Sequence, residues 1–207
     1  MKKTVLRTVT ICAGAPLLAL GVGTATAWAD TTAPSTDTTT TEQTADGGLA
    51  ISWGGFTLVQ TGNSTAQTLG PSLTIASNNS HAAAGGGGNL AIATNNSYAG
   101  ASGLLNTAIA DNNSEAQAGF GSSTGNTSIA RDGSTARVES GNFNTVRATN
   151  NSSATSRIGS NNTVTATDGS TADISGDANR VAVRCGGSVV FEAQSNLIVT
   201  SVPCEAG

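Results

Sequence analysis

The chain has 207 residues, of which only 11% are charged and 3% aromatic. After position 29 its basic residues are six arginines, against thirteen acidic residues, which leaves that part with a formal charge of −7. We therefore expect no binding to nucleic acid or to anionic membrane surfaces, because both are bound through basic patches. The length suits a single small domain.

Residues 1–29 have the layout of a cleavable secretory signal peptide. Lys2, Lys3 and Arg7 precede an apolar run, and small residues then lead to Ala29. The apolar run is interrupted by glycine and proline and is short for a membrane-spanning helix. The sequence thus predicts a secreted protein, extracellular or at the cell surface, with no membrane association after cleavage.

Two segments of opposite character follow the signal peptide. Residues 30–48 are rich in Thr and contain no large apolar side chain. They cannot bury enough surface to offset the entropy of ordering them, which predicts a disordered linker. Residues 49–71 instead hold the densest group of large apolar residues, including Trp53 and Phe56. We interpret them as an N-terminal cap for the fold that follows.

From residue 72 onward the sequence repeats with a period of 17 to 20 residues. The second and fourth residues of a unit are mostly Ala or Val, and this period of two indicates a strand with one face inward. A turn signal such as Asn-Asn-Ser or Asp-Gly-Ser follows. Each unit starts at an asparagine: Asn89, Asn106, Asn126, Asn144, Asn162, Asn179 and Asn196. A second strand starts at the serine of the turn signal: Ser97, Ser114, Ser134, Ser152, Ser170 and Ser188, with the last inward residue predicted at Val190.

These features predict an all-β fold, a small two-sided β-solenoid (a β-helix or β-roll) of about seven to eight coils over residues 72–207. One unit with two short strands cannot fold alone, but stacked units pair their backbones at ~4.8 Å and align equivalent residues in columns. The alternative is a disordered low-complexity segment, because small and polar residues dominate. That alternative does not explain why the inward positions and turns keep their register over six units.

Three kinds of contact between coils are predicted. The recurrent asparagines predict a buried ladder in which the side-chain amides bond to one another along the stack. Glu139 and Arg157 fall in equivalent places of neighbouring coils and are expected to pair. Cys185 and Cys204, the cysteines left after signal cleavage, predict a disulfide that closes the C-terminal end.

The sequence offers no residues from which to build an enzyme. His81 is the only histidine and is expected at an outward turn position. Asp111, Asp132 and Asp168 occupy turn positions, but the Gly-Gly-x-Gly-x-Asp repeat of calcium-binding rolls is missing, which favours a structural role. We expect no enzymatic activity, no metal and no cofactor.

The outward residues one and three positions after the unit asparagines form a candidate contact face. In the early coils an isoleucine stripe lies beside a threonine column. An apolar stripe on a flat sheet indicates a contact surface, here for self-association or for another surface or matrix. The predicted members are Thr107, Thr127, Thr145, Thr163, Ile92, Ile109 and Ile129.

A recurring Gly-x-x-Asn-x-[Ala/Val] pattern extends over roughly residues 72–200. Its instances are Gly86/Asn89/Ala91, Gly103/Asn106/Ala108, Gly141/Asn144/Val146, Gly159/Asn162/Val164 and Gly176/Asn179/Val181. The pattern resembles the curlin repeat of secreted amyloid fibre subunits and the head repeats of trimeric autotransporter adhesins, which form left-handed β-rolls. The recurrent Gln of curlin repeats and the C-terminal membrane barrel of autotransporters are missing. The resemblance therefore implies roles only for core-forming and turn-forming residues.

Three functions compete on these grounds. The leading hypothesis is a secreted, non-enzymatic structural or adhesive protein of a surface or matrix. The alternative is a curlin-like amyloid fibre subunit that grows by edge pairing. A third, ice or crystal binding, requires Thr-x-Thr on one wall of every coil, and Ile109, Ile129 and Arg147 interrupt that pattern.

Overall fold

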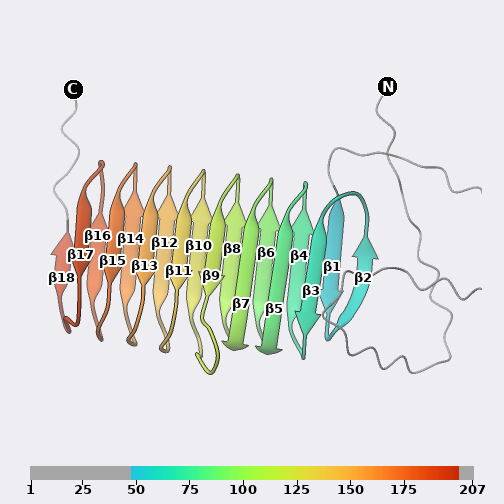
Figure 1. The fold of residues 1–207 in the computed structure, drawn as a ribbon, viewed down its shortest axis with the longest axis horizontal. Coiled ribbons are helices and arrows are strands. Elements are labelled where there is room, and N and C mark those ends of the chain that lie inside the picture. Colours follow the sequence, from blue (N-terminus) through green and yellow to red (C-terminus); the bar gives the residue numbers. More distant parts are fainter. Residues whose placement is uncertain (1–47, 201–207) are drawn as a thin grey trace, which may run out of the picture.

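The computed structural model describes residues 48–200, which form a β-solenoid with two facing sheets (Figure 1). One sheet has ten strands in the order β18-β16-β14-β12-β10-β8-β6-β4-β1-β2, and the other has eight in the order β17-β15-β13-β11-β9-β7-β5-β3. From β3 onward, consecutive strands alternate between the sheets, so each coil adds one strand to each. The predicted all-β, two-sided β-solenoid of seven to eight coils is confirmed.

The strands are short, as expected for a narrow solenoid. The ten-stranded sheet contains β1 (Leu49–Trp53), β2 (Phe56–Gln60), β4 (Leu73–Ser77), β6 (Leu90–Thr94), β8 (Thr107–Asp111), β10 (Thr127–Arg131), β12 (Thr145–Thr149), β14 (Thr163–Thr167), β16 (Arg180–Val183) and β18 (Ile198–Thr200). The eight-stranded sheet contains β3 (Thr65–Leu69), β5 (His81–Gly87), β7 (Tyr98–Leu104), β9 (Glu115–Ala118), β11 (Thr135–Val138), β13 (Ser153–Ser156), β15 (Thr171–Ile174) and β17 (Ser188–Phe191).

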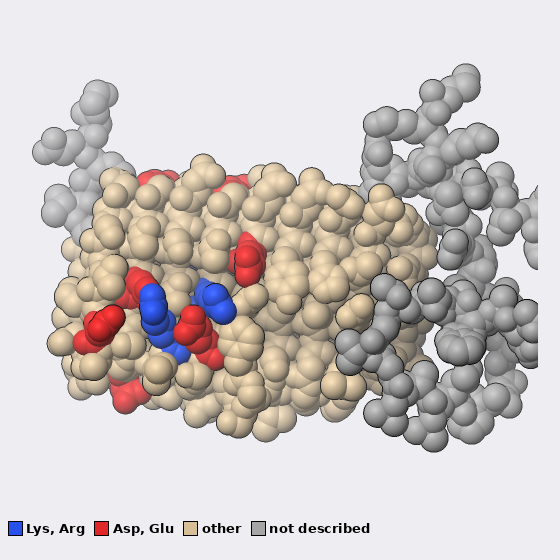
Figure 2. All heavy atoms as spheres, in the orientation of Figure 1, with Lys and Arg blue, Asp and Glu red and all other residues tan. Residues whose placement is uncertain are grey.

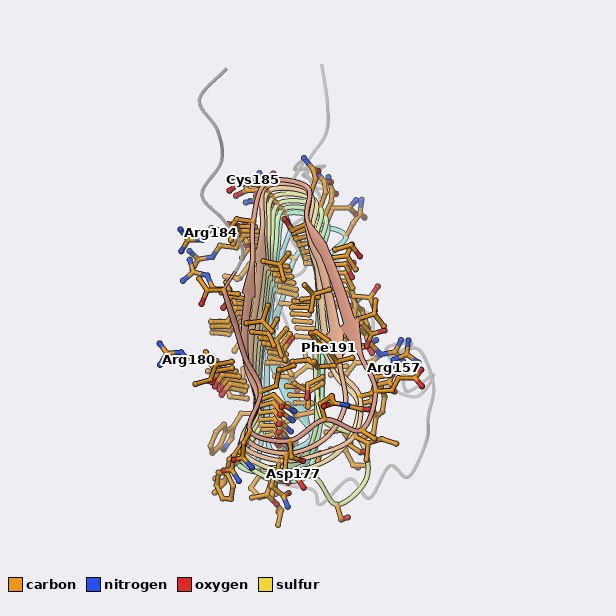
Figure 3. The ribbon with its side chains drawn as sticks, turned by 90° about the vertical axis from the view of Figure 1, so that its left-hand side faces the viewer. Arg157, Asp177, Arg180, Arg184, Cys185 and Phe191 are labelled. Atoms are coloured by element: carbon orange, nitrogen blue, oxygen red, sulfur yellow. The ribbon has the colours of Figure 1, made fainter. Side chains whose placement is uncertain are left out.

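The core consists of columns of small residues between the sheets. In the coil formed by β6 and β7 the inward residues are Ala91, Ala93, Ala99 and Ala101, all at most 3% exposed. Later coils carry larger side chains at equivalent positions, and in the last coil Phe191 points between the sheets (Figure 3). Alanine columns fit because the two walls are close, and bulky side chains from both walls would clash.

From β4 to β16, the corner after each strand of the ten-stranded sheet is made by two consecutive left-handed residues. Asn95 and Asn96 have φ of 56° and 58°, and the same pair of conformations recurs at Asp132 and Gly133. Asn, Asp and Gly adopt this conformation at the lowest cost, which explains the recurring turn signals. The backbone also bonds from coil to coil here, for example from Asn96 N to Asn78 O at 3.0 Å.

The N-terminal cap differs in form from the solenoid. β1 and β2 make an antiparallel hairpin that extends the ten-stranded sheet, and β1 pairs antiparallel with β4. The parallel stack already starts at β3, which pairs with β5. The solenoid therefore begins at Thr65, before the predicted start at residue 72. The hairpin turn is Gly54-Gly55, both with positive φ, as a two-residue hairpin turn requires.

The last coil is shifted by one residue from its predicted frame. Ala172 aligns with Val189, so Val189 is the inward residue, and Val190 is 59% exposed. Gly187 takes the place predicted for Ser188. The Thr171 N–H donates to the Gly187 carbonyl, just as the Ser153 N–H of the preceding coil donates to the Ser170 carbonyl.

Several predictions fall outside the described residues. They are the signal peptide over residues 1–29, all of the linker except Gly48, and Cys204 with its predicted bond to Cys185. Among residues 48–200, no helix is long and apolar enough to cross a membrane.

Candidate contact face and its supporting ladders

The predicted asparagine column is buried and bonds each coil to the next. The Oδ1 atom of Asn106 accepts from the Asn126 backbone N–H at 2.8 Å, and the Oδ1 atom of Asn126 accepts from the Asn144 N–H at 2.9 Å. The same bond recurs from Asn89 to Asn179. These side chains are at most 2% exposed. The amide oxygen thus holds the backbone at the start of the next strand.

The amide nitrogen of each ladder asparagine holds the connection of the next coil, three residues before the next position in the ladder. Nδ2 of Asn144 donates to the Gly159 carbonyl at 2.7 Å, and Nδ2 of Asn162 donates to the Gly176 carbonyl at 2.7 Å. Among the described members of this ladder, bonds from amide to amide occur only from Asn126 to Asn106 and from Asn144 to Asn126, at 3.0 and 3.1 Å. The ladder is therefore mainly a set of amide-to-backbone bonds rather than the predicted chain of amides.

Asn196 does not belong to the ladder, contrary to prediction. The Oδ1 atom of Asn179 accepts from the Leu197 N–H at 3.0 Å, so Leu197 occupies the next position in the column. Asn196 is exposed and has a φ of 58°. Its position matches Asn161 and Ala178, whose N–H groups bond in the same way to the preceding coil. The interval from Asn179 to Leu197 is 18 residues, as it is from Asn126 to Asn144 and from Asn144 to Asn162.

The residues of the candidate contact face lie in register on the outer side of the ten-stranded sheet. Thr107, Thr127, Thr145 and Thr163 follow one another along one column. The neighbouring column runs from Ile51 through Ile75, Ile92, Ile109 and Ile129 before it changes to Arg147. The isoleucines are half-buried, so they present a low, flat surface. Ile75, which was not predicted, could have been found by extending the same frame back one unit.

Charge is divided sharply along the stack. Residues 48–110 contain no Asp, Glu, Lys or Arg, and the first charged side chain of the solenoid is Asp111. On the side shown in Figure 2, the charged residues accordingly lie over the C-terminal half. The contact face around Ile92 and Ile109 therefore lies in the uncharged half of the molecule.

The three turn aspartates take part in the corner ladders. Asp111 accepts from Nδ2 of Asn95 at 2.8 Å, and Asp168 accepts from Nδ2 of Asn150 at 2.8 Å. Asp132 accepts from Nδ2 of Asn112 at 2.7 Å. The pKa of Asp111 is lowered, chiefly by the Thr94 hydroxyl, and the pKa of Asp168 is lowered, chiefly by the Asn150 amide. Within residues 48–200, no three His, Cys, Asp or Glu side chains group as metal ligands would.

Arg157 bonds to a different carboxylate from the one predicted. Its guanidinium makes a forked interaction with Asp173, with Nε at 2.9 and 3.0 Å from the two oxygens. Asp173 lies one coil further along on β15, and this bond raises the pKa of Arg157. The Oε1 atom of Glu139 lies instead 3.7 Å from the Nε atom of Arg137. Arg157 points away from the core (Figure 3).

His81 is placed on a strand and not in a turn. It is the first residue of β5, is half-buried, and stacks on Tyr98 of the next coil with ring centroids 5.4 Å apart. Its Nδ1 atom also bonds to the Thr65 hydroxyl. Burial lowers its pKa. These contacts make His81 a structural part of the eight-stranded sheet, beside a shallow groove that Tyr98 and Glu115 also line.

A second apolar surface lies at the N-terminal end of the stack. We call Trp53, Phe56, Leu58, Val59 and Leu69 the N-terminal end surface; their exposed fractions run from 39% for Val59 to 76% for Leu69. All five residues of β2 are exposed. The sequence indicated this apolar group, which was interpreted as an N-terminal cap.

Comparison with models of protein families, with curated proteins and with solved structures finds no match for this chain.

Proposed function

We propose that the protein is a secreted, non-enzymatic structural or adhesive protein of a cell surface or matrix. The observation that carries this proposal is the flat Ile-Thr face, uncharged over β4 and β6, on a solenoid whose coils are bonded to each other at every corner. Such a frame holds the side chains of a column at a fixed spacing of ~4.8 Å. The signal-like layout of residues 1–29 supports secretion, and the Thr-rich residues 30–48 suit a tether.

A curlin-like fibre subunit is the second candidate. Its support is that β2 and β18 are both outermost strands of the ten-stranded sheet, and outermost strands can pair with another chain. The resemblance of the repeat to curlin repeats points the same way. The predicted Cys185–Cys204 bond would close the C-terminal end and so opposes growth there.

The adhesive function is tested by adsorption of the chain from Asp30 onward to sensor surfaces that carry either methyl or hydroxyl groups. Ile92→Lys places a charge in the contact face and should weaken adsorption to the methyl surface about 10-fold or more, because the ammonium group must lose water. Ala83→Lys is the matched control, since Ala83 is also half-buried and outward-facing but lies on the eight-stranded sheet. Equal loss in both variants, or in neither, would contradict the proposal.

The fibre candidate is tested by incubating the same oxidised chain and measuring binding of an amyloid-specific dye. Dye-positive filaments would favour the second candidate. Particles of constant size without dye binding would favour the first.

A further inference from the structure

The N-terminal end surface combines exposed apolar side chains with a free sheet edge. β2 is the outermost strand of the ten-stranded sheet, and its residues Phe56–Gln60 are exposed throughout. Phe56 is 69% exposed and Leu58 is 53% exposed. β2 also lacks charged residues and proline, which natural edge strands commonly use to prevent pairing. This end of the molecule is therefore suited to contact with another surface.

The two ends of the stack differ in charge. No charged residue occurs within residues 48–110, so two N-terminal ends can approach without repulsion. Near the C-terminal end, Asp177, Arg180 and Arg184 surround the last coils (Figure 3). Bringing N-terminal ends together therefore requires no desolvation of a charged side chain within residues 48–110.

The chain's own linker is a poor cover for this surface. Residues 30–47 contain Thr, Ser, Ala, Pro, Gln and acidic residues, and none has a large apolar side chain. A second copy of the chain, in contrast, offers the same uncharged, apolar surface. Identical surfaces can meet about a two-fold axis, the commonest symmetry of soluble oligomers.

We propose that two copies associate through their N-terminal end surfaces into a closed dimer, with the solenoids end to end. Phe56 and Leu58 supply the apolar contact, and the β2 strands of the two copies lie antiparallel. A bulge leaves Leu58 without a partner on β1, because Ile51 pairs with Val59 and Ser52 with Thr57. The bulge limits backbone pairing between the two β2 strands to a short stretch, so contacts between side chains provide most of the attraction between the copies.

The dimer has a definite shape and does not propagate. Because both copies use the same surface, that surface is fully occupied in the dimer, and the two C-terminal ends point outward. The ten-stranded sheet, at ~4.8 Å per strand, is about 48 Å long, so the dimer that meets through β2 is a rod of about 95 Å. Both tethers leave from the middle of this rod, and two contact faces act together. The inference goes beyond the proposed function, and either can fail alone.

The test is sedimentation of the chain from Asp30 onward, with scattering to measure length. The expected result is a concentration-dependent dimer with the length of two solenoids. Phe56→Lys should weaken dimerisation about 100-fold or more, because it places two like charges in the apolar contact between the copies. Gln60→Lys, at an exposed polar position of β2, is a second variant in case Phe56→Lys does not fold. Ile198→Lys is the matched control at the other end, where Ile198 is 76% exposed on β18.

Three outcomes would overturn the proposal. The first is a monomer at all concentrations. The second is a dimer that survives Phe56→Lys and Gln60→Lys but is lost in Ile198→Lys. The third is continued growth beyond two copies, which indicates contact between unlike ends. Loss of the dimer in either β2 variant, with Ile198→Lys unaffected, supports it.

Discussion

Each ladder asparagine performs two tasks that few other side chains can combine. It accepts the N–H just before the next strand and donates to a carbonyl three residues earlier in the same connection, as Asn144 does with Asn162 and Gly159. Aspartate offers the acceptor but not the donor, and glutamine is longer by one methylene. A thin solenoid has little apolar core, so satisfying these buried groups matters more than in a large domain.

Asn144→Ala should destabilise the solenoid by roughly 2–5 kcal/mol, because it removes the amide that bonds to the buried Asn162 N–H and to the half-buried Gly159 carbonyl. Asn144→Asp should restore the bond to Asn162 but place an oxygen against the Gly159 carbonyl, and so should not recover stability at neutral pH. Urea unfolding followed by circular dichroism measures both changes. Thr145→Ala, at an exposed neighbouring position, is the control and should change little. Similar midpoints for Asn144→Ala and Thr145→Ala would show that the ladder is not a main source of stability.

At the level of the elements, the corners couple adjacent coils through side chains as well as backbone. An asparagine amide of one coil meets a carboxylate of the next, as at Asn95 and Asp111. Asn95 itself has a left-handed backbone conformation, and Asp111 directly precedes a residue that has one. The turn residues thus shape the corner and fasten it to its neighbour. The lowered pKa values of Asp111 and Asp168 report this coupling.

Acid should weaken this coupling. A pKa that is lower in the folded chain than in the unfolded chain contributes stability above the unfolded value, and this contribution is lost as the pH falls through the folded value. The melting temperature should therefore drop below about pH 4. Asp111→Asn should lower the melting temperature at pH 7 and make the drop smaller, because one coupled carboxylate is gone.

Thermal scans between pH 7 and pH 2 measure this dependence. Glu115→Gln is the matched control, since it removes an exposed carboxylate from the same coil as Asp111. An unchanged acid-induced drop in Asp111→Asn would show that its bonds to Thr94 and Asn95 contribute nothing to stability.

Most of the coil could be predicted from the sequence, because a period of two fixes which residues face inward. Ala91 and Val164 were placed in the core on that basis and are fully buried. The last coil was misplaced because two consecutive valines, Val189 and Val190, fit the inward position equally well. Only the corner decides between them, and Cys185-Gly186-Gly187 replaces the usual turn signal there.

The hairpin and the ladder geometry were harder to predict. Gly54-Gly55 between apolar runs is a recognised hairpin signal, yet nothing in the sequence says that β1 joins the ten-stranded sheet antiparallel to β4. The spacing of asparagines shows a column but not the direction in which each amide points. That direction depends on carbonyls such as Gly159, which only the folded backbone brings near.

On the scale of the whole molecule, two gradients run along the stack in the same direction. The N-terminal coils are uncharged and have an alanine core, whereas the C-terminal coils carry the charges and bury valine and isoleucine. Fully burying a larger aliphatic side chain contributes more free energy than burying alanine. In a repeat protein each coil depends mainly on itself and its neighbours, so stability should vary along the stack.

Hydrogen exchange should accordingly be slower in the coil of β14 and β15, with Val164 and Ile174 in its core, than in the coil of β6 and β7, whose inward residues are all alanine. Both coils lie inside the stack, so fraying at the ends affects neither directly. Mass spectrometry of peptic fragments measures the difference. Val164→Ala should bring the exchange of β14 toward that of β6, because it removes the larger core side chain. Equal protection of the two coils in the original chain would mean that the solenoid opens as one cooperative unit and that core size does not set local stability.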